Sequence, residues 1–290
     1  MKKNISELLS SNKRKELILI SFFACLSSLF LTTTIIFANL YMKITQRKFK
    51  AKRFLEEVPQ ASSDDRYIPV LSNMTEDAGA LIYRGKHDIN NSKYFKYIDI
   101  YNMNSSGSLI LLENFKTYQQ TSEYSCGIAS LIMAVYRING TILNETDMSI
   151  RVGANEENGT LIADLERLVG ELGFEYECKT TFNESTNPTR SVESFAEYIK
   201  DSLTNNEPII VLSYDWGGHY SVIIGYDDMG TSDYISDDII ILADPYDTTD
   251  HMNDGYTIFN LERYYAQMSL PVFGIKDQDF NFIKIKRKNN

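Results

Sequence analysis

The sequence has few of the residues that build metal centres or disulfide frameworks. Its 290 residues include three cysteines and three histidines, and none of them forms a CxxC pair or a Cys/His cluster with metal-ligand spacing. A structural zinc site is therefore not expected. Cys25 lies within an apolar run, so Cys126 and Cys178 are the pair left for a disulfide, which a location outside the cell would permit.

Positive charge is scarce beyond residue 53. The first 53 residues carry eleven Lys/Arg and two Asp/Glu, whereas the rest of the chain carries 18 basic and 37 acidic residues. This acidic part contains no polybasic stretch interleaved with aromatic residues, so binding to nucleic acid is not expected. The chain also contains no internal repeat and no GxxxxGK[ST] phosphate-binding loop, so an ATP-binding function is not expected.

One long apolar run lies near the N-terminus, after a basic tail at residues 1–16. Residues 17–42 are 26 consecutive residues without a charge. About 20 apolar residues span a bilayer, whereas the apolar part of a signal peptide has about 7–15. We therefore expect a single-pass membrane anchor, with a cleaved secretion signal as the alternative. Lys and Arg flank both ends almost equally and do not determine the orientation. The short tail and the large acidic part favour an extracytoplasmic domain.

The rest of the chain is predicted to form one α+β domain at residues 106–290, after a basic juxtamembrane segment and polar lead-in at 43–105. Apolar residues with helical spacing predict helices at 126–138, 159–174 (with Thr160 as N-cap), 191–203 and about 260–268. Short apolar runs predict strands at 108–115, 208–215, 219–228, 238–245 and 272–276. Helices first and strands later predict a helical half packed on a mostly antiparallel sheet.

Cys126 stands where a polar loop becomes a helix-patterned run, in QQTSEYSCGIASLIMAVYRING at 119–140. The pKa of a thiol falls at a helix N-terminus and beside an imidazolium, and Gly127 permits close backbone approach. Taken alone, however, this position is more typical of an inert buried cysteine. A reactive thiol therefore needs a partner base elsewhere in the chain.

His219 is the candidate base. It opens the strand pattern HYSVIIGYDD directly after a glycine pair, whereas the other two histidines lie in polar, turn-rich segments. Asp244 ends the next apolar run, and adjacent antiparallel strands would bring it beside His219 to orient the ring. The backbone N–H of Cys126 and the side-chain amide of Gln120 are candidate donors to an oxyanion. Each residue alone has an ordinary structural explanation, but together they predict a thiol hydrolase.

These residues resemble those of the papain-like cysteine peptidases of the C39 and C39-like group, which includes the leader-cleaving domains of bacteriocin exporters. The matching stretches are QTSEYSCGIAS at 120–130, GGHYSVIIGYDD at 217–228 and ILADP at 241–245, within about residues 112–280. The resemblance implies a papain-like fold. It also implies a nucleophile at Cys126, a base at His219, an orienting carboxylate at Asp244 and an oxyanion donor at Gln120.

The sequence departs from the leader-cleaving members at Ser125, where they usually have Asp, and neither an exporter transmembrane domain nor an ATPase follows. These departures leave the thiol chemistry intact. We expect a membrane-anchored cysteine peptidase that hydrolyses a peptide or isopeptide bond of a peptide or protein, without metal or cofactor. Two alternatives are an inactive peptide-binding module of the same fold and an acyl-transferring, transpeptidase-like enzyme. Cys178 is expected in a strand, and a disulfide to Cys126 would abolish catalysis.

Overall fold

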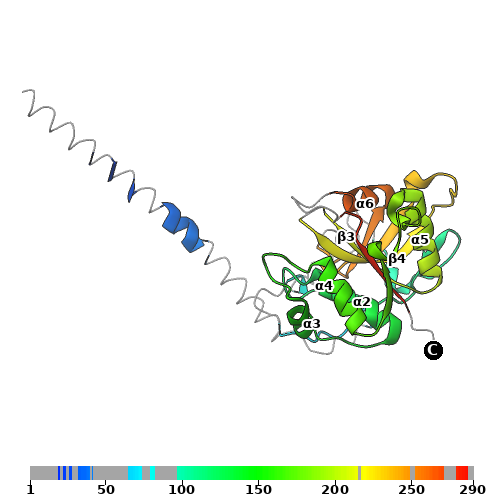
Figure 1. The fold of residues 1–290 in the computed structure, drawn as a ribbon, viewed down its shortest axis with the longest axis horizontal. Coiled ribbons are helices and arrows are strands. Elements are labelled where there is room, and N and C mark those ends of the chain that lie inside the picture. Colours follow the sequence, from blue (N-terminus) through cyan, green and yellow to red (C-terminus); the bar gives the residue numbers. More distant parts are fainter. Residues whose placement is uncertain are drawn as a thin grey trace, which may run out of the picture. The chain divides into compact units, whose positions relative to one another are not determined.

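The computed structural model describes residues 65–73, 79–81, 97–214, 217–248, 252–270 and 279–286, together with residues 19, 22–23, 26–27, 32–39 and 41 (Figure 1). The chain divides into two compact units, residues 1–50 and 51–290. The predicted basic tail and much of the predicted anchor at 17–42 lie outside the described residues, and residues 32–39 are helical. Within the part that is described, no helix has both the length and the apolar character needed to cross a bilayer.

The second unit is built on an antiparallel sheet. In its described residues the strands are β1 (Leu109–Leu111), β2 (Glu175–Cys178), β3 (Ile209–Ser213), β4 (His219–Asp227), β5 (Ile239–Ala243), β6 (Tyr256–Asn260) and β7 (Phe282–Lys286). Their order is β2-β7-β3-β4-β5-β6, and β1 pairs with β4. Every residue of β3 is buried, as are residues 220–226 of β4, so both faces of the central sheet are covered.

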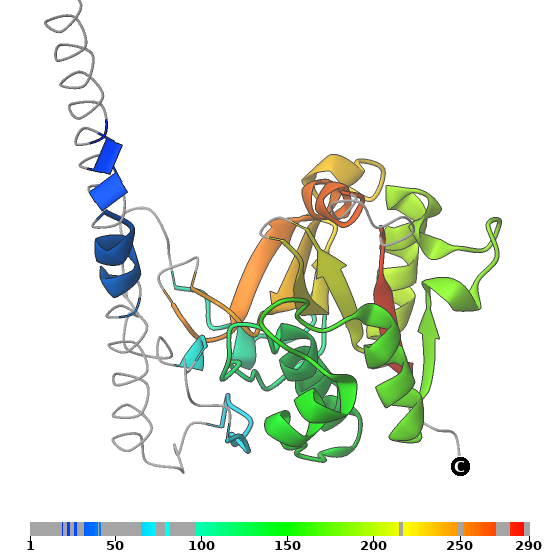
Figure 2. The same ribbon diagram turned by 60° about the vertical axis from the view of Figure 1, so that its left-hand side comes forward.

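Helices cover this sheet. They are α2 (Cys126–Asn139), α3 (Glu145–Val152), α4 (Ile162–Glu171), α5 (Val192–Thr204) and α6 (Leu261–Met268), with short 3-10 turns η2 (Ile100–Asn102), η3 (Lys179–Thr181), η4 (Pro188–Arg190) and η5 (Ile235–Asp237). The helix α2 packs on β3, β4 and β7, whereas α6 contacts β3 and β6. In both ribbon views α2, α3 and α4, drawn in green, lie together on one side of the domain, and α6 lies on the other (Figures 1 and 2).

The α+β class and the antiparallel sheet are confirmed. The helices predicted at 126–138, 191–203 and 260–268 are present, with Ser191 and Asn260 capping α5 and α6 through their side chains. The second helix begins at Ile162, later than predicted, because Thr160 is buried against α2 and does not cap it. The helix α3 was not predicted, since its eight residues show little apolar periodicity. The strand predicted at 272–276 lies outside the described residues.

Parts of the predicted lead-in pack on the domain. Ile68 is fully buried in its core, and its N–H donates to the Thr117 carbonyl at 2.9 Å. Ala80 is also fully buried, and its N–H donates to the Gln120 carbonyl at 3.0 Å. The domain boundary at residue 106 remains a prediction, but these lead-in residues contact the loop that precedes Cys126.

Candidate active site

Cys126 is the first residue of α2, and its thiol is free and almost fully buried. Burial raises the pKa of this thiol. A hydrogen bond with His219, the charge of that ring, and backbone N–H groups of Tyr220 and Gly127 together outweigh burial, so the pKa of Cys126 lies below its ordinary value. Charged and dipolar groups that favour a thiolate are what an activated cysteine requires. The position at a helix start that the sequence predicts for Cys126 is confirmed.

His219 and Asp244 meet because of strand pairing. His219 opens β4 after Gly217 and Gly218, whose φ angles of +100° and +109° are readily adopted only by glycine. Ala243 of β5 pairs with Val222 of β4, so the next residue, Asp244, falls beside the start of β4. The two side chains join through His219 Nε2 and Asp244 Oδ1 at 2.7 Å. Burial lowers the pKa of His219, but the charge and hydrogen bond of Asp244, with a contribution from Cys126, raise it to about 10.

Asp244 is held in place by further hydrogen bonds. Its Oδ1 also accepts from the Tyr246 N–H at 2.8 Å, and its backbone N–H donates to the Gly255 carbonyl at 2.8 Å. Its own carbonyl accepts from Gln119 Nε2 at 3.0 Å. Only 10 % of the Asp244 side chain is exposed, against 24 % of the His219 side chain. Because Nε2 is used by Asp244, Nδ1 is the ring nitrogen left for Cys126.

Gln120 lies in the same loop, and its side chain is buried. Its Nε2 donates to the Ser122 carbonyl at 2.6 Å, while its Oε1 has no hydrogen-bond partner. The opposite amide orientation would place two oxygens against each other, so Nε2 belongs at this position. An amide group carries two N–H bonds, and the contact with Ser122 uses one of them. The structure thus brings Cys126, His219 and Asp244 together, with Gln120 bonded to its own loop.

Gly127 explains how α2 approaches β4 so closely. A Cβ atom at this position would lie 2.9 Å from Thr160 Cβ and 3.2 Å from Tyr220 Cδ2. The Tyr220 hydroxyl in turn donates to the Thr160 carbonyl at 3.1 Å. Only glycine leaves room for this packing between the residue after Cys126 and the residue after His219. The close backbone approach expected from the sequence is confirmed.

Cys178 is not paired with Cys126. It is the last residue of β2, its thiol is free and buried, and its Sγ is 3.1 Å from the Thr180 hydroxyl. Burial raises the pKa of Cys178, with hydrogen bonds to residues 180 and 181 acting against it. The two thiols therefore differ in the direction of their pKa shifts. Within the described residues, no group of three or more His, Cys, Asp or Glu is arranged to hold a metal ion.

Sequence reasoning missed Glu145. This carboxylate is fully buried, and Ser125 donates to its Oε1 at 2.6 Å. Its sequence context, NETD after a turn, is typical of an exposed helix start, so no local signal indicated a buried contact with the residue before Cys126.

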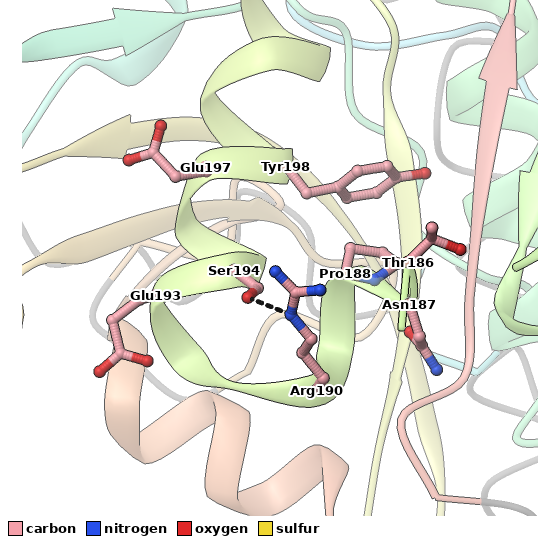
Figure 3. Close-up of a pocket in the computed structure, with 8 residues that line it drawn as sticks. All are labelled: Thr186, Asn187, Pro188, Arg190, Glu193, Ser194, Glu197 and Tyr198. Carbon is pink, nitrogen blue, oxygen red and sulfur yellow. Dashed lines mark hydrogen bonds between the residues drawn. The ribbon is translucent and has the colours of Figure 1, made fainter. Parts of the chain in front are cut away.

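A pocket is formed around η4 and the first turns of α5. Its volume is about 390 Å³, and it is lined by Thr186, Asn187, Pro188, Arg190, Glu193, Ser194, Glu197 and Tyr198 (Figure 3). The Arg190 side chain is held within this pocket by a hydrogen bond in which its Nε donates to Ser194 Oγ at 3.0 Å. None of the candidate catalytic residues lines this pocket.

The model of the peptidase C39-like family matches residues 112–271, more than half of the chain. The chain therefore belongs to the peptidase C39-like family.

Solved structures give weaker likenesses. One is the peptidase domain of Streptococcus ComA, a bifunctional ABC transporter involved in quorum sensing. It has 18% identity and a TM-score of 0.39, over 60% of this chain and 99% of that one. Another is a double-glycine motif protease from an AMS/PCAT transporter, in complex with a leader peptide. It has 14% identity and a TM-score of 0.36, over 59% and 91% of the two chains. Likeness at this level is no basis for assigning their activity to this chain. A search of curated proteins found no significant match.

Proposed function

We propose that the chain is a cysteine peptidase in which Cys126 is the nucleophile, His219 the acid–base and Asp244 the residue that orients His219. The observation that carries this proposal is the 2.7 Å hydrogen bond from His219 to Asp244, beside a helix-start thiol whose pKa is lowered by the same ring. The substrate is a peptide or protein, and the bond cleaved is a peptide or isopeptide bond.

The geometry supports a thiolate–imidazolium mechanism. The lowered pKa of Cys126 and the pKa of His219 raised to about 10 both favour placing the proton on the ring, which leaves the thiolate beside it. The thiolate attacks the substrate carbonyl carbon, and the oxyanion accepts hydrogen bonds from the Cys126 N–H and the second N–H of Gln120 Nε2. His219 then gives its proton to the leaving amine, and water hydrolyses the thioester.

We further propose that residues 17–42 anchor the chain in a membrane with the peptidase domain on the extracytoplasmic side. The length of this uncharged run and the acidic character of the remainder support the proposal. Full-length protein that remains in the membrane fraction after alkaline extraction, and whose domain is digested by external protease on intact cells, is the expected result. Release by alkaline extraction would contradict the anchor.

Thiol labelling tests the catalytic proposal. Limiting iodoacetamide is added to the full-length protein at neutral pH, and mass spectrometry follows alkylation of Cys126 and Cys178 separately. Cys126 is expected to react at least about tenfold faster, because the thiolate is the reacting species and the pKa values shift in opposite directions. Digestion of a peptide library by the wild type, with Cys126→Ala as the control, then identifies hydrolysis. Equal labelling of the two cysteines would contradict an activated thiol.

A further inference from the structure

Glu145 is an unusual residue to find in the interior. It is the first residue of α3, and none of its surface is exposed. In the described part of the chain no Lys, Arg or His forms an ion pair with it. A buried carboxylate without a cation is costly unless hydrogen bonds replace the lost water.

Four hydrogen bonds replace the lost water at the Glu145 carboxylate, and all of their donors lie in the loop from Tyr118 to Ser125. Oε1 accepts from the Thr121 N–H at 3.0 Å and the Ser125 hydroxyl at 2.6 Å. Oε2 accepts from the Tyr118 hydroxyl at 2.8 Å and the Thr121 hydroxyl at 2.7 Å. The residues bound in this way include the one after Gln120 and the one before Cys126. Each carboxylate oxygen therefore holds two points of the loop from Tyr118 to Ser125, which contains the candidate oxyanion donor Gln120 and leads into Cys126.

The carboxylate is itself held rigidly. The Glu145 N–H donates to the Leu71 carbonyl at 2.8 Å, and the Asn144 side chain caps α3 by accepting from the Asp147 N–H at 3.0 Å. A negative charge is also favoured at a helix N-terminus. Burial raises the pKa of Glu145, while the hydrogen bonds from Ser125, Thr121 and Tyr118 act against that rise. The loop and the carboxylate thus constrain each other, since a loop that moved away would leave a buried acid without donors.

Resting on the peptidase function proposed above, we propose that Glu145 is a positioning residue. It holds the loop from Tyr118 to Ser125 in the shape that directs the Gln120 amide and the Cys126 N–H to one carbonyl oxygen. It does not touch the substrate. Its removal is expected to weaken stabilisation of the oxyanion, while the pairing of Cys126 with His219 persists, because that pairing comes from α2 and the sheet.

Two reagents separate these effects. Acylation by p-nitrophenyl acetate passes through an oxyanion: a bond forms between Cys126 Sγ and the carbonyl carbon, and p-nitrophenolate leaves. Alkylation by iodoacetamide displaces iodide at a saturated carbon and develops no oxyanion. The ratio of the two rates at Cys126 therefore reports the oxyanion site independently of thiolate content. Both rates are measured on the full-length protein, with the Cys126→Ala rate subtracted.

Three variants make the test specific. Glu145→Ala is expected to lower the acylation-to-alkylation ratio by about 100-fold or more, the scale of losing one oxyanion donor. Glu145→Gln is expected to lower it less than about tenfold, because its Oε1 can accept from Thr121 N–H and Ser125 while its amide faces hydroxyls that can turn. Met148→Ala removes buried packing from the same helix without touching the loop hydrogen bonds, and is expected to leave the ratio unchanged.

The outcomes distinguish failure of the positioning role of Glu145 from failure of the peptidase proposal. An unchanged ratio in Glu145→Ala, or an equal fall in Met148→Ala, would overturn the positioning role while leaving the peptidase proposal intact. If wild-type Cys126 reacts with neither reagent faster than Cys178 does, the peptidase proposal is wrong and the positioning role falls with it. Should Glu145→Ala not fold, Ser125→Ala removes one of the four donors. A fall in the acylation-to-alkylation ratio that is smaller than the fall expected for Glu145→Ala supports the positioning role of Glu145. An unchanged ratio overturns it.

Discussion

Replacing Asp244 by Asn removes the negative charge of the side chain but keeps its size and an oxygen that accepts hydrogen bonds. Asp244 Oδ1 accepts from both His219 Nε2 and the Tyr246 N–H, at 2.7 and 2.8 Å. An asparagine carbonyl oxygen in the same place accepts both bonds, and its amide replaces Oδ2. The orientation of the ring is therefore expected to survive in Asp244→Asn, so the variant isolates the effect of the negative charge on His219.

The direction of the resulting change follows from the pKa of His219. Burial lowers this pKa, and Asp244 is the largest influence that raises it to about 10. Without the charge of Asp244 the pKa of His219 falls, and the imidazolium that lowers the pKa of Cys126 is less populated. The thiolate–imidazolium pair exists above the pKa of Cys126 and below that of His219. Its pH window should therefore narrow from both sides, with the alkaline limit falling from about 10 towards the ordinary value of about 6.5.

The rate of Cys126 alkylation as a function of pH, with Cys178 as an internal reference, reports the acid limit of the window, where the thiolate is lost. The pH dependence of peptide hydrolysis reports the alkaline limit, because the leaving amine needs a proton from the ring. Peptide hydrolysis, once a substrate is found, should fall by about 10²–10⁴-fold at neutral pH, the contribution expected of a positioned acid–base. An alkaline limit that stays at the same pH in Asp244→Asn would refute the electrostatic role assigned to Asp244.

Two further substitutions test the packing. Gly127→Ala should lower the free energy of unfolding by about 1–3 kcal/mol, because a Cβ there lies 2.9 Å from its nearest neighbour. Gly170→Ala, in α4 with nothing nearer than 3.7 Å, should be neutral or stabilising by up to about 1 kcal/mol. Lys284→Met should cost about 1–3 kcal/mol in urea unfolding, because it removes a buried cation that pairs with Glu177 and Glu207, while Lys286 continues to pair with Glu177. Lys200→Met, at an exposed pair, should cost less than about 1 kcal/mol, and equal losses would contradict the buried pairing.

The elements predicted correctly are those whose signal is local and strong. The run at 126–138 has apolar residues at helical spacing, and 239–243 is an unbroken apolar stretch, so α2 and β5 follow from burial alone. The His219–Asp244 contact was also predictable, because β4 and β5 are consecutive antiparallel strands and the pairing of neighbours along the chain is common.

Other elements depend on contacts that are distant along the chain. The strand β7 carries Lys284, a residue type that is rarely buried, and nothing near it indicates that it is covered. Its charge is accommodated by Glu177 and Glu207 at 2.8 and 3.3 Å, more than 70 residues away in sequence. Glu145 is missed for the same reason, since a carboxylate after a capping Asn is typical of a solvated helix start.

The close packing at Gly127 links stability to chemistry. The helix α2 carries Cys126 and β4 carries His219, and the contact of residue 127 with Thr160 and Tyr220 limits how near the two elements lie. A methyl group at residue 127 must displace α2, β4 or the segment that carries Thr160, and a shift of α2 or β4 lengthens the hydrogen bond that lowers the pKa of Cys126. Gly127→Ala should therefore raise the pH at which Cys126 begins to alkylate, whereas Gly170→Ala should leave it unchanged. A variant that unfolds more easily but keeps the wild-type alkylation profile would show that the spacing between thiol and ring is set elsewhere.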